Sequence, residues 1–221
     1  MVLAVTVGAA AANWLSRLPD GSLDVPVGDQ GDRAASRWLE WLTKPAVTIG
    51  LLALAALAEP ASAGQQRWFL VGLAMCLVGD VALMLPTERF RTGLIAFLLG
   101  HIAFVAGFLE RGQPAPRWSI AFGAVVLVAC LAVGLRHLLP SVRRSHPALL
   151  APVGVYVMVI AVMAVAAWWG GHWAAPLGAA TFAVSDLTLA DNKFVIGRRW
   201  SPVLVMMTYH LALLMLVASL G

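Results

Sequence analysis

Two acidic residues, Asp80 and Asp186, lie inside otherwise apolar stretches of this chain. In a membrane-spanning helix an ionisable side chain costs about 2.5 to 3.5 kcal/mol, so such residues usually have a function. Each aspartate lies about five residues before the expected cytoplasmic end of its helix, roughly 8 Å deep at the rise of an α-helix. One buried aspartate could be only a structural hydrogen-bond partner. Two at matched depth favour a functional pair.

The chemistry open to this pair is acid–base chemistry. Two carboxyl groups in a low-dielectric cavity tend to share a proton, because both cannot ionise cheaply. One can then act as a general acid while the other stabilises a cation or orients water. Aspartyl proteolysis, hydrolysis through an oxocarbenium ion and proton-coupled transport all use this arrangement. The spacing of the two residues does not choose among them.

Further polar side chains occur at similar depth in other apolar stretches. At 1.5 Å rise per residue they lie roughly 10 to 14 Å below the cytoplasmic surface, and they are His101, Tyr156, Tyr209 and His210. Residues at the rim of that surface are Lys44, Glu88, Asn192 and Lys193, and Ser185 directly precedes Asp186. The outer half has fewer polar groups, so the pattern predicts one pocket open to the cytoplasm. His101 as a helix-packing donor, and the tyrosines as packing aromatics, remain open alternatives.

The elements that position these residues are apolar helices. Of the 221 residues, 61% are hydrophobic and 12% charged, and the mean hydropathy is +0.85. A soluble domain carries about 25% charged residues, so this composition argues against a soluble enzyme or a nucleic-acid binder. We therefore expect an all-α integral membrane protein, a single polytopic domain over residues 1–221. Cys76 and Cys130 lie in apolar runs and are interpreted as small buried hydrophobes.

Eight apolar segments are candidates for membrane-spanning helices, although the first two are short and need flanking residues to span. They are Met1–Leu15, Pro45–Ala58, Trp68–Leu85, Thr92–Leu109, Trp118–Leu139, Pro147–Trp169, Trp173–Ala190 and Pro202–Leu220. The first segment could instead be the apolar part of a signal peptide, but it lacks a basic leading region. We expect eight transmembrane helices.

The long polar stretch over residues 16–44 is expected to be a cytoplasmic loop. Its last part, from Arg33 to Leu42, places Trp38 and Trp41 on one side of a possible helix. Tryptophan beside arginine suits a helix in the headgroup layer. An early first turn of the second span explains the same residues equally well.

Orientation follows from the basic residues. Twelve of the 15 lysines and arginines fall on the side shared by the loops that join spans 1–2, 3–4, 5–6 and 7–8. The remaining three are Arg67, Arg111 and Arg117. The positive-inside rule makes the richer side cytoplasmic. The pocket should then face the cytoplasm and both termini the outside. The Ala/Arg-rich composition is consistent with a bacterial plasma (inner) membrane.

The surroundings of the two aspartates resemble each other. The pattern Gly72-x7-Asp80-x2-Leu83 matches Gly178-x7-Asp186-x2-Leu189. The two segments are spans 3 and 7, so they run in the same direction. This spacing fits a parallel four-plus-four repeat, an arrangement known in membrane proteins.

An ordered set of motifs from Trp38 to the C-terminus resembles the YhhN family of membrane lysoplasmalogenases. The motifs are Trp38-x5-Lys44-Pro45, Leu77-Val-Gly-Asp80-x2-Leu83-x-Leu-Pro86, Phe90-x2-Gly93, Ala96-Phe-x3-His101-x2-Phe104, Tyr156, Phe182-x2-Ser185-Asp186-x2-Leu189-Ala-x-Asn192-Lys193-Phe194 and Tyr209. The chain departs from the family in a long acidic first loop and in His210. Neither departure removes a proposed catalytic group.

The resemblance implies cleavage of the vinyl-ether bond of lysoplasmalogens to a fatty aldehyde and a glycerophospho-base. Asp80 and Asp186 would then be the acid and base, with unassigned individual roles. His101, Tyr156, Ser185 and Tyr209 would position them, and Lys44, Asn192 and Lys193 would bind the phosphate. The partners would be a lysophospholipid substrate and membrane lipids. No metal or cofactor is expected, and no His/Cys/Asp cluster has metal-ligand spacing.

Three other functions remain compatible with the residues. An intramembrane aspartyl protease uses paired aspartates, but Leu77 replaces the first glycine of its motif and the two aspartates lie four spans apart. A proton-coupled transporter would use the same carboxylates as a relay. A membrane protein that cleaves a related ether or ester lipid, or only binds lipid, would need the same pocket.

Overall fold

The computed structural model of this chain describes residues 2–15, 30–85, 89–113, 117–169 and 172–221, and every regular element in these ranges is helical. In chain order the elements are α1 (Val2–Leu15), α2 (Gln30–Leu57), α3 (Ala63–Met84), α4 (Phe90–Glu110), α5 (Arg117–Val133), the π-helical turn η1 (Gly134–Leu138), α6 (Leu139–Ser145), the 3-10 turn η2 (Pro147–Leu149), α7 (Leu150–Trp169), α8 (Ala174–Phe194) and α9 (Ser201–Ala218). The prediction of an all-α fold is confirmed for these ranges.

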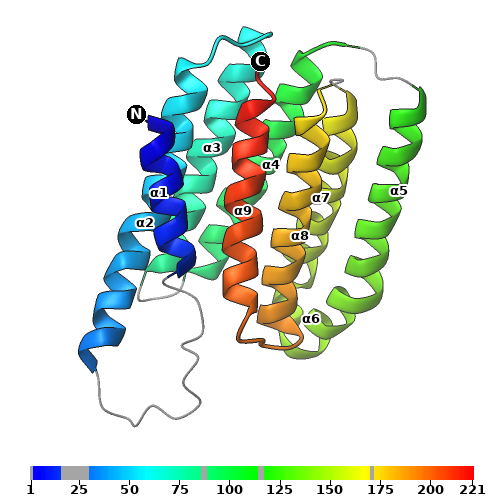
Figure 1. Cartoon of the computed structure of the whole chain (residues 1–221). Helices are drawn as coiled ribbons and strands as arrows, with labels where there is room; N and C mark the ends of the chain where they lie inside the picture. Colours follow the sequence, from blue (N-terminus) through cyan, green and yellow to red (C-terminus); the bar gives the residue numbers. More distant parts are fainter. Residues whose placement is uncertain (1, 16–29, 86–88, 114–116, 170–171) are drawn as a thin grey trace.

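The helices form one bundle in which successive long helices run in opposite directions (Figure 1). Helix α1 begins, and α9 ends, at the same end of the bundle, which we call the terminal end. Two hydrogen bonds tie this end together: the Ala61 N–H donates to the Leu220 carbonyl (2.8 Å), and the Arg111 guanidinium donates to the Ser219 carbonyl (2.7 Å). We call the opposite end the pocket end.

Five helical stretches are long and apolar enough to cross a membrane, which supports a membrane protein. They are Ala63–Met84, Phe90–Glu110, Gly123–Ser145, Pro147–Trp169 and Ser201–Ala218. Helix α1 has 14 residues, the apolar part of α2 covers only Thr43–Leu57, and α8 carries several charged residues near its end. Each predicted span has a helix at its place, but the count of eight crossings stays a prediction.

Helix α2 continues without a break through Pro45 and begins at Gln30. The segment from Arg33 to Leu42 is therefore an extension of the second predicted span. This is one of the two interpretations that the sequence allows for the segment. Whether this extension lies in the headgroup layer remains a prediction.

Close packing of α3 against α4 depends on glycines spaced seven residues apart. A Cβ on Gly79 would lie 2.7 Å from the Phe97 ring, and a Cβ on Gly100 would lie 3.2 Å from the Gly72 carbonyl oxygen. Small residues of this kind let membrane helices approach closely. The approach places Asp80, at the end of α3, beside the first turns of α4.

Helices α8 and α9 pack closely in a similar way. A Cβ on Gly178 would meet the Ala212 carbonyl oxygen at 3.2 Å. Between the α3–α4 and α8–α9 pairs lies a core whose largest side chains are fully buried: Phe69, Phe104, Phe108 and Phe182. Both aspartates therefore lie in helices that the neighbouring helix holds at close range.

Candidate active site

A polar pocket of about 860 Å³ opens between α2, α3, α4, α8 and α9 at the pocket end, and both Asp80 and Asp186 line it. Its other polar lining residues are Lys44, Ser185, Asn192, Lys193 and Tyr209. The two aspartates are 106 residues apart in sequence (186 − 80). The fold thus brings both into the wall of one cavity.

Asp80 is fully buried and is surrounded by groups that stabilise negative charge. The Lys44 ammonium lies 3.2 Å from Oδ1. The hydroxyls of Thr48 and Tyr209 each donate a hydrogen bond of 2.9 Å to Oδ2. Hydrogen bonds and a nearby cation both favour the ionised form of a carboxyl group.

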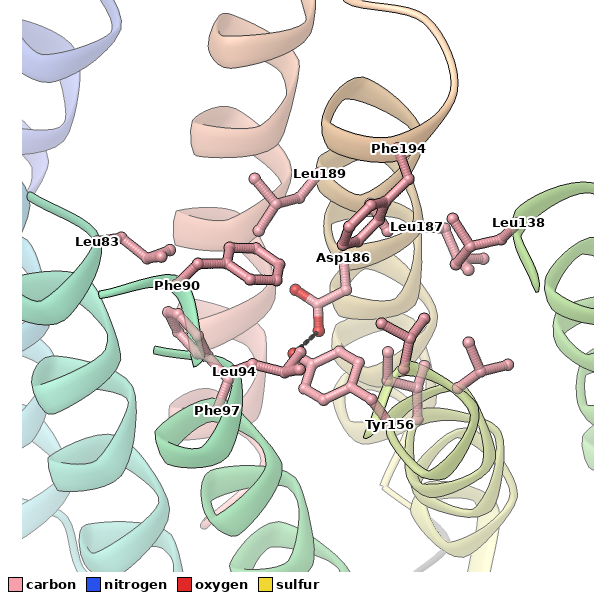
Figure 2. Close-up of a pocket in the computed structure, with 14 residues that line it drawn as sticks. Leu83, Phe90, Leu94, Phe97, Leu138, Tyr156, Asp186, Leu187, Leu189 and Phe194 are labelled. Atoms are coloured by element: carbon pink, nitrogen blue, oxygen red, sulfur yellow. Dashed lines mark hydrogen bonds between the residues drawn. The ribbon is translucent and has the colours of Figure 1, made fainter. Parts of the chain in front are cut away.

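Asp186 has a different set of partners, a phenol and an imidazole. The Tyr156 hydroxyl donates a 2.7 Å hydrogen bond to Oδ2, drawn as the dashed line in Figure 2. His101 Nε2 lies 3.2 Å from the same oxygen, an ion-pair distance without the alignment of a hydrogen bond. His101 Nδ1 lies 2.7 Å from the Phe97 carbonyl oxygen. A carbonyl oxygen can only accept, so Nδ1 carries a proton and donates it.

The partners of the two aspartates come from different parts of the chain. Asp80, in α3, is held by α2, the preceding helix, and by α9. Asp186, in α8, is held by α7, the preceding helix, and by α4. Each carboxyl group is therefore contacted by one helix from its own half of the chain and one helix from the other half.

An apolar pocket of about 490 Å³ adjoins the polar pocket at Asp186. Its walls come from α3, α4, η1, α7 and α8, and its only polar lining residues are Tyr156 and Asp186. Figure 2 shows the Asp186 carboxylate between Phe90 and Phe194 on one side and Tyr156 on the other. Asp186 thus faces both a polar and an apolar cavity.

Lys44 lies deeper than the rim at which the sequence placed it. The residue is 4% exposed, and its ammonium pairs with Asp80. The close approach of α2 to α3 lets the lysine reach inward, because a buried carboxyl group attracts the nearest cation. The structure therefore places Lys44 with the buried carboxyl group.

Three other predicted site residues line the polar pocket and also make local contacts. Ser185 donates to the Val205 carbonyl (3.0 Å), and Asn192 accepts from the Arg198 N–H (2.8 Å). The Lys193 ammonium lies 5.3 Å from the centre of the Phe90 ring. Ser185 joins α8 to α9, whereas Asn192 and Lys193 lie at the mouth of the pocket.

His210 does not join the two carboxyl groups. Its Nδ1 accepts a 3.1 Å hydrogen bond from the Trp14 indole, and the residue lines a separate cavity between α1, α2 and α9. His210 follows Tyr209 directly, so in a helix the two side chains point in different directions. Glu88 lies outside the residues that the structure describes.

Thr48 is a site residue that sequence reasoning missed. It is fully buried and donates to Asp80. The available signal was its position four residues after Lys44, which puts both side chains on one face of a helix. In the part of the chain that the structure covers, no three His, Cys, Asp or Glu side chains converge as metal ligands would.

The fold and the site define a helical membrane protein with two carboxyl groups buried in one pocket. The YhhN family matches residues 39–220, and the chain belongs to this family. No solved structure matches the chain.

Three relatives illustrate how far the family similarity extends. The chain is 31% identical to a protein named "Lysoplasmalogenase" from Mycobacterium bovis (strain ATCC BAA-935 / AF2122/97), over 76% of this chain and 66% of that protein. It is 32% identical to "Lysoplasmalogenase TMEM86A" from Homo sapiens, over 81% of this chain and 72% of that protein. It is 26% identical to "Uncharacterized membrane protein YhhN" from Escherichia coli O157:H7, over 62% of this chain and 75% of that protein. The chain thus spans slightly less than two thirds of the mycobacterial relative.

Proposed function

We propose that this protein hydrolyses the vinyl-ether bond of lysoplasmalogens, giving a fatty aldehyde and a glycerophospho-base, with Asp80 and Asp186 as the acid–base pair. The observation that carries the proposal is that one pocket contains two carboxyl groups with different partners. The names of the mycobacterial and human relatives support this substrate class. A pocket within apolar helices suits a lipid substrate.

Asp186 is proposed as the proton donor, together with His101. Because Nδ1 of His101 donates to a carbonyl oxygen, a neutral ring would present only a lone pair at Nε2. A bare Nε2 facing an ionised carboxylate at 3.2 Å would be repulsive, so the two groups share one proton. Whichever group holds it, this proton is available to the substrate, as general acid catalysis requires.

Asp80 is proposed as the carboxylate that stabilises the cation and activates water. Three groups stabilise its negative charge: the Lys44 ammonium as an ion pair, and the hydroxyls of Thr48 and Tyr209 through hydrogen bonds. A fixed negative group placed where positive charge develops lowers the barrier without any reorganisation during the reaction.

The reaction follows from this division of roles. A proton passes from the Asp186–His101 pair to the alkenyl carbon beyond the ether carbon, and an oxocarbenium ion forms. Water adds to the ether carbon and loses a proton to Asp80, giving a hemiacetal. The hemiacetal then breaks its bond to the glycerol oxygen, releasing the aldehyde and the alcohol. One water is consumed, and both carboxyl groups regain their starting protonation through solvent at the open pocket.

The mouth of the polar pocket is proposed as the phosphate site and as the cytoplasmic face. Lys193 and Asn192 supply a cation and an amide there. The basic loops at this end favour the cytoplasm by the positive-inside rule. In this orientation the pocket draws substrate from the inner leaflet of a bacterial plasma membrane.

The decisive experiment is aldehyde release from a lysoplasmalogen by purified protein in detergent. Wild type, Asp80→Asn and Asp186→Asn are compared, with an ester lysophospholipid as the control substrate. Asparagine preserves volume and removes the titratable proton, so we expect each variant to lose about 10²- to 10⁴-fold in rate while remaining folded. Glu59→Gln is a matched control, because Glu59 is exposed and lies outside both pockets.

A folded wild type that releases no aldehyde would overturn the proposal. Proton-coupled transport, which uses the same carboxylates as a relay, would then be the next function to assay. Activity that survives in both asparagine variants would support the hydrolase activity but contradict the proposed role of the two aspartates.

A further inference from the structure

The apolar pocket has no part in the reaction steps given above. Its lining is built almost entirely of hydrocarbon and aromatic side chains from α3, α4, η1, α7 and α8. Leu138, Val153 and Val157 are each less than 5% exposed, so these walls are held by the surrounding core. A cavity of this kind binds an apolar group with little cost in ordering its own walls.

The apolar pocket is continuous with the site of the two carboxyl groups. Five residues line both cavities: Leu83, Phe90, Phe97, Asp186 and Leu189. Four of them are apolar, and the fifth is the proposed proton donor. A group bound in the apolar pocket would therefore contact Asp186 at the point where the apolar pocket joins the polar pocket.

The length of the pocket can be judged along α8. Asp186 and Phe194 both line the pocket and are eight residues apart on α8, which corresponds to about 12 Å along the helix axis. Ala190, the smallest side chain in the lining, lies midway between them. The lining between these two residues is apolar, as a hydrocarbon segment requires.

We propose that the apolar pocket is the hydrocarbon-chain subsite of this enzyme, and that Ala190 and Leu138 determine which alkenyl chain lengths it cleaves. The proposal rests on the function proposed above and deepens it. When the alkenyl chain of the substrate lies in the apolar pocket and its glycerophospho group lies in the polar pocket, the substrate can bind in only one orientation. The alkenyl carbon that takes the proton then lies beside Asp186, and the ether oxygen lies on the side of Asp80.

The first test narrows the pocket. Ala190→Phe and the milder Ala190→Leu add volume to its centre, and Val184→Phe adds volume to the same helix at a residue that is 50% exposed. Short-chain and long-chain lysoplasmenylethanolamines serve as paired substrates. The Ala190 variants should shift the ratio of kcat/KM toward the short chain by about tenfold or more, while Val184→Phe should keep the wild-type ratio.

The second test widens the pocket. Leu138→Ala removes a side chain from the wall contributed by η1. This variant should shift the same ratio toward the long chain, opposite to Ala190→Leu. Opposite shifts from two helices are not expected of general loss of folding, which lowers both rates together.

Binding of saturated alkyl-ether lysophospholipids provides a readout that does not need catalysis. Wild type should bind a long-chain analogue more tightly than a short-chain one, and Ala190→Phe should lose that difference. An unchanged chain preference in Ala190→Leu, Ala190→Phe and Leu138→Ala, in both turnover and binding, would overturn the chain subsite. A wild type that binds these analogues but cleaves no vinyl ether would instead overturn the proposed function and leave the subsite in place.

Discussion

At the residue scale, the environment of each aspartate distinguishes it from its counterpart. Asp80 faces an ammonium and two hydroxyls, whereas Asp186 faces a phenol and an imidazole. Both aspartates and most of their partners could be predicted from the sequence, because an ionisable residue in an apolar run is conspicuous. Thr48 could not, because a single threonine in a membrane helix is common and usually bonds to its own backbone.

Thr48 offers a prediction at this scale. Thr48→Val preserves shape and removes one of the donors to Asp80, and hydrogen bonds to charged groups contribute about 1.5 to 3 kcal/mol. We expect kcat for aldehyde release to fall about tenfold or more, with the thermal unfolding midpoint little changed. Thr181→Val is the control, because the Thr181 hydroxyl donates only to the Leu177 carbonyl of its own helix. Equal effects of the two variants would argue against a role for Thr48 in the pocket.

Lys44 gives a second prediction, about stability. Removing one partner of a buried ion pair leaves an uncompensated charge and costs about 3 to 5 kcal/mol. Lys44→Met should therefore lower the unfolding midpoint in detergent and abolish aldehyde release, since the pair is nearly inaccessible to solvent. Lys44→Met combined with Asp80→Asn should recover much of the stability and none of the activity. Failure of the second substitution to restore stability would show that the two residues are not coupled.

At the scale of elements, the closeness of α3 and α4 sets the geometry of the site. The positions of the helices could be predicted, because apolar runs of suitable length identify them. The continuation of α2 through Pro45 was one of two alternatives that the sequence left open, because proline usually ends a helix. Lys44 is buried and does not lie at the rim, because α2 packs against α3. Counting residues from the end of a helix cannot predict this packing.

The packing of α3 on α4 is tested by Gly79→Ala. The added Cβ would lie 2.7 Å from the Phe97 ring, and overpacking of this kind typically costs about 1 to 3 kcal/mol. We expect a lower unfolding midpoint and slower turnover, because Phe97 walls both pockets and its carbonyl holds His101. Gly154→Ala in α7 is the matched control, since its Cβ would meet nothing within 4 Å. If Gly79→Ala were as benign as Gly154→Ala, the close packing would not be what holds Phe97 in place.

At the scale of the whole molecule, the polar pocket is lined by residues near the end of α3 and the start of α4. Figure 1 shows that these helix ends lie at the end of the bundle opposite the terminal end. The basic residues predict which end is cytoplasmic. The four-plus-four repeat also stays a prediction at this scale. The exchange of partners between the halves is the pattern that such a repeat would produce, because α3 and α8 are each held by the helix before them and by the last helix of the other half.

Orientation is tested by cysteine labelling in bacterial cells that express the protein, with Cys76 and Cys130 replaced by alanine. Glu59→Cys lies near the terminal end, and Arg144→Cys lies in α6 at the pocket end. A membrane-impermeant maleimide should label the first variant in intact cells and the second only after permeabilisation. The reverse pattern would place the pocket on the outer face.

The crossed contacts of the two aspartates also bear on how the protein is made. The ribosome releases α3 early, but the Tyr209 hydroxyl that contacts Asp80 belongs to α9 and is synthesised 129 residues later. The nascent chain therefore inserts Asp80 into the bilayer with only its α2 partners in place. The cavity is complete only after α9 has been synthesised. A chain that terminates before α9 should therefore have an incomplete site at Asp80, even though Asp186 and its contacts from α4 and α7 are already present.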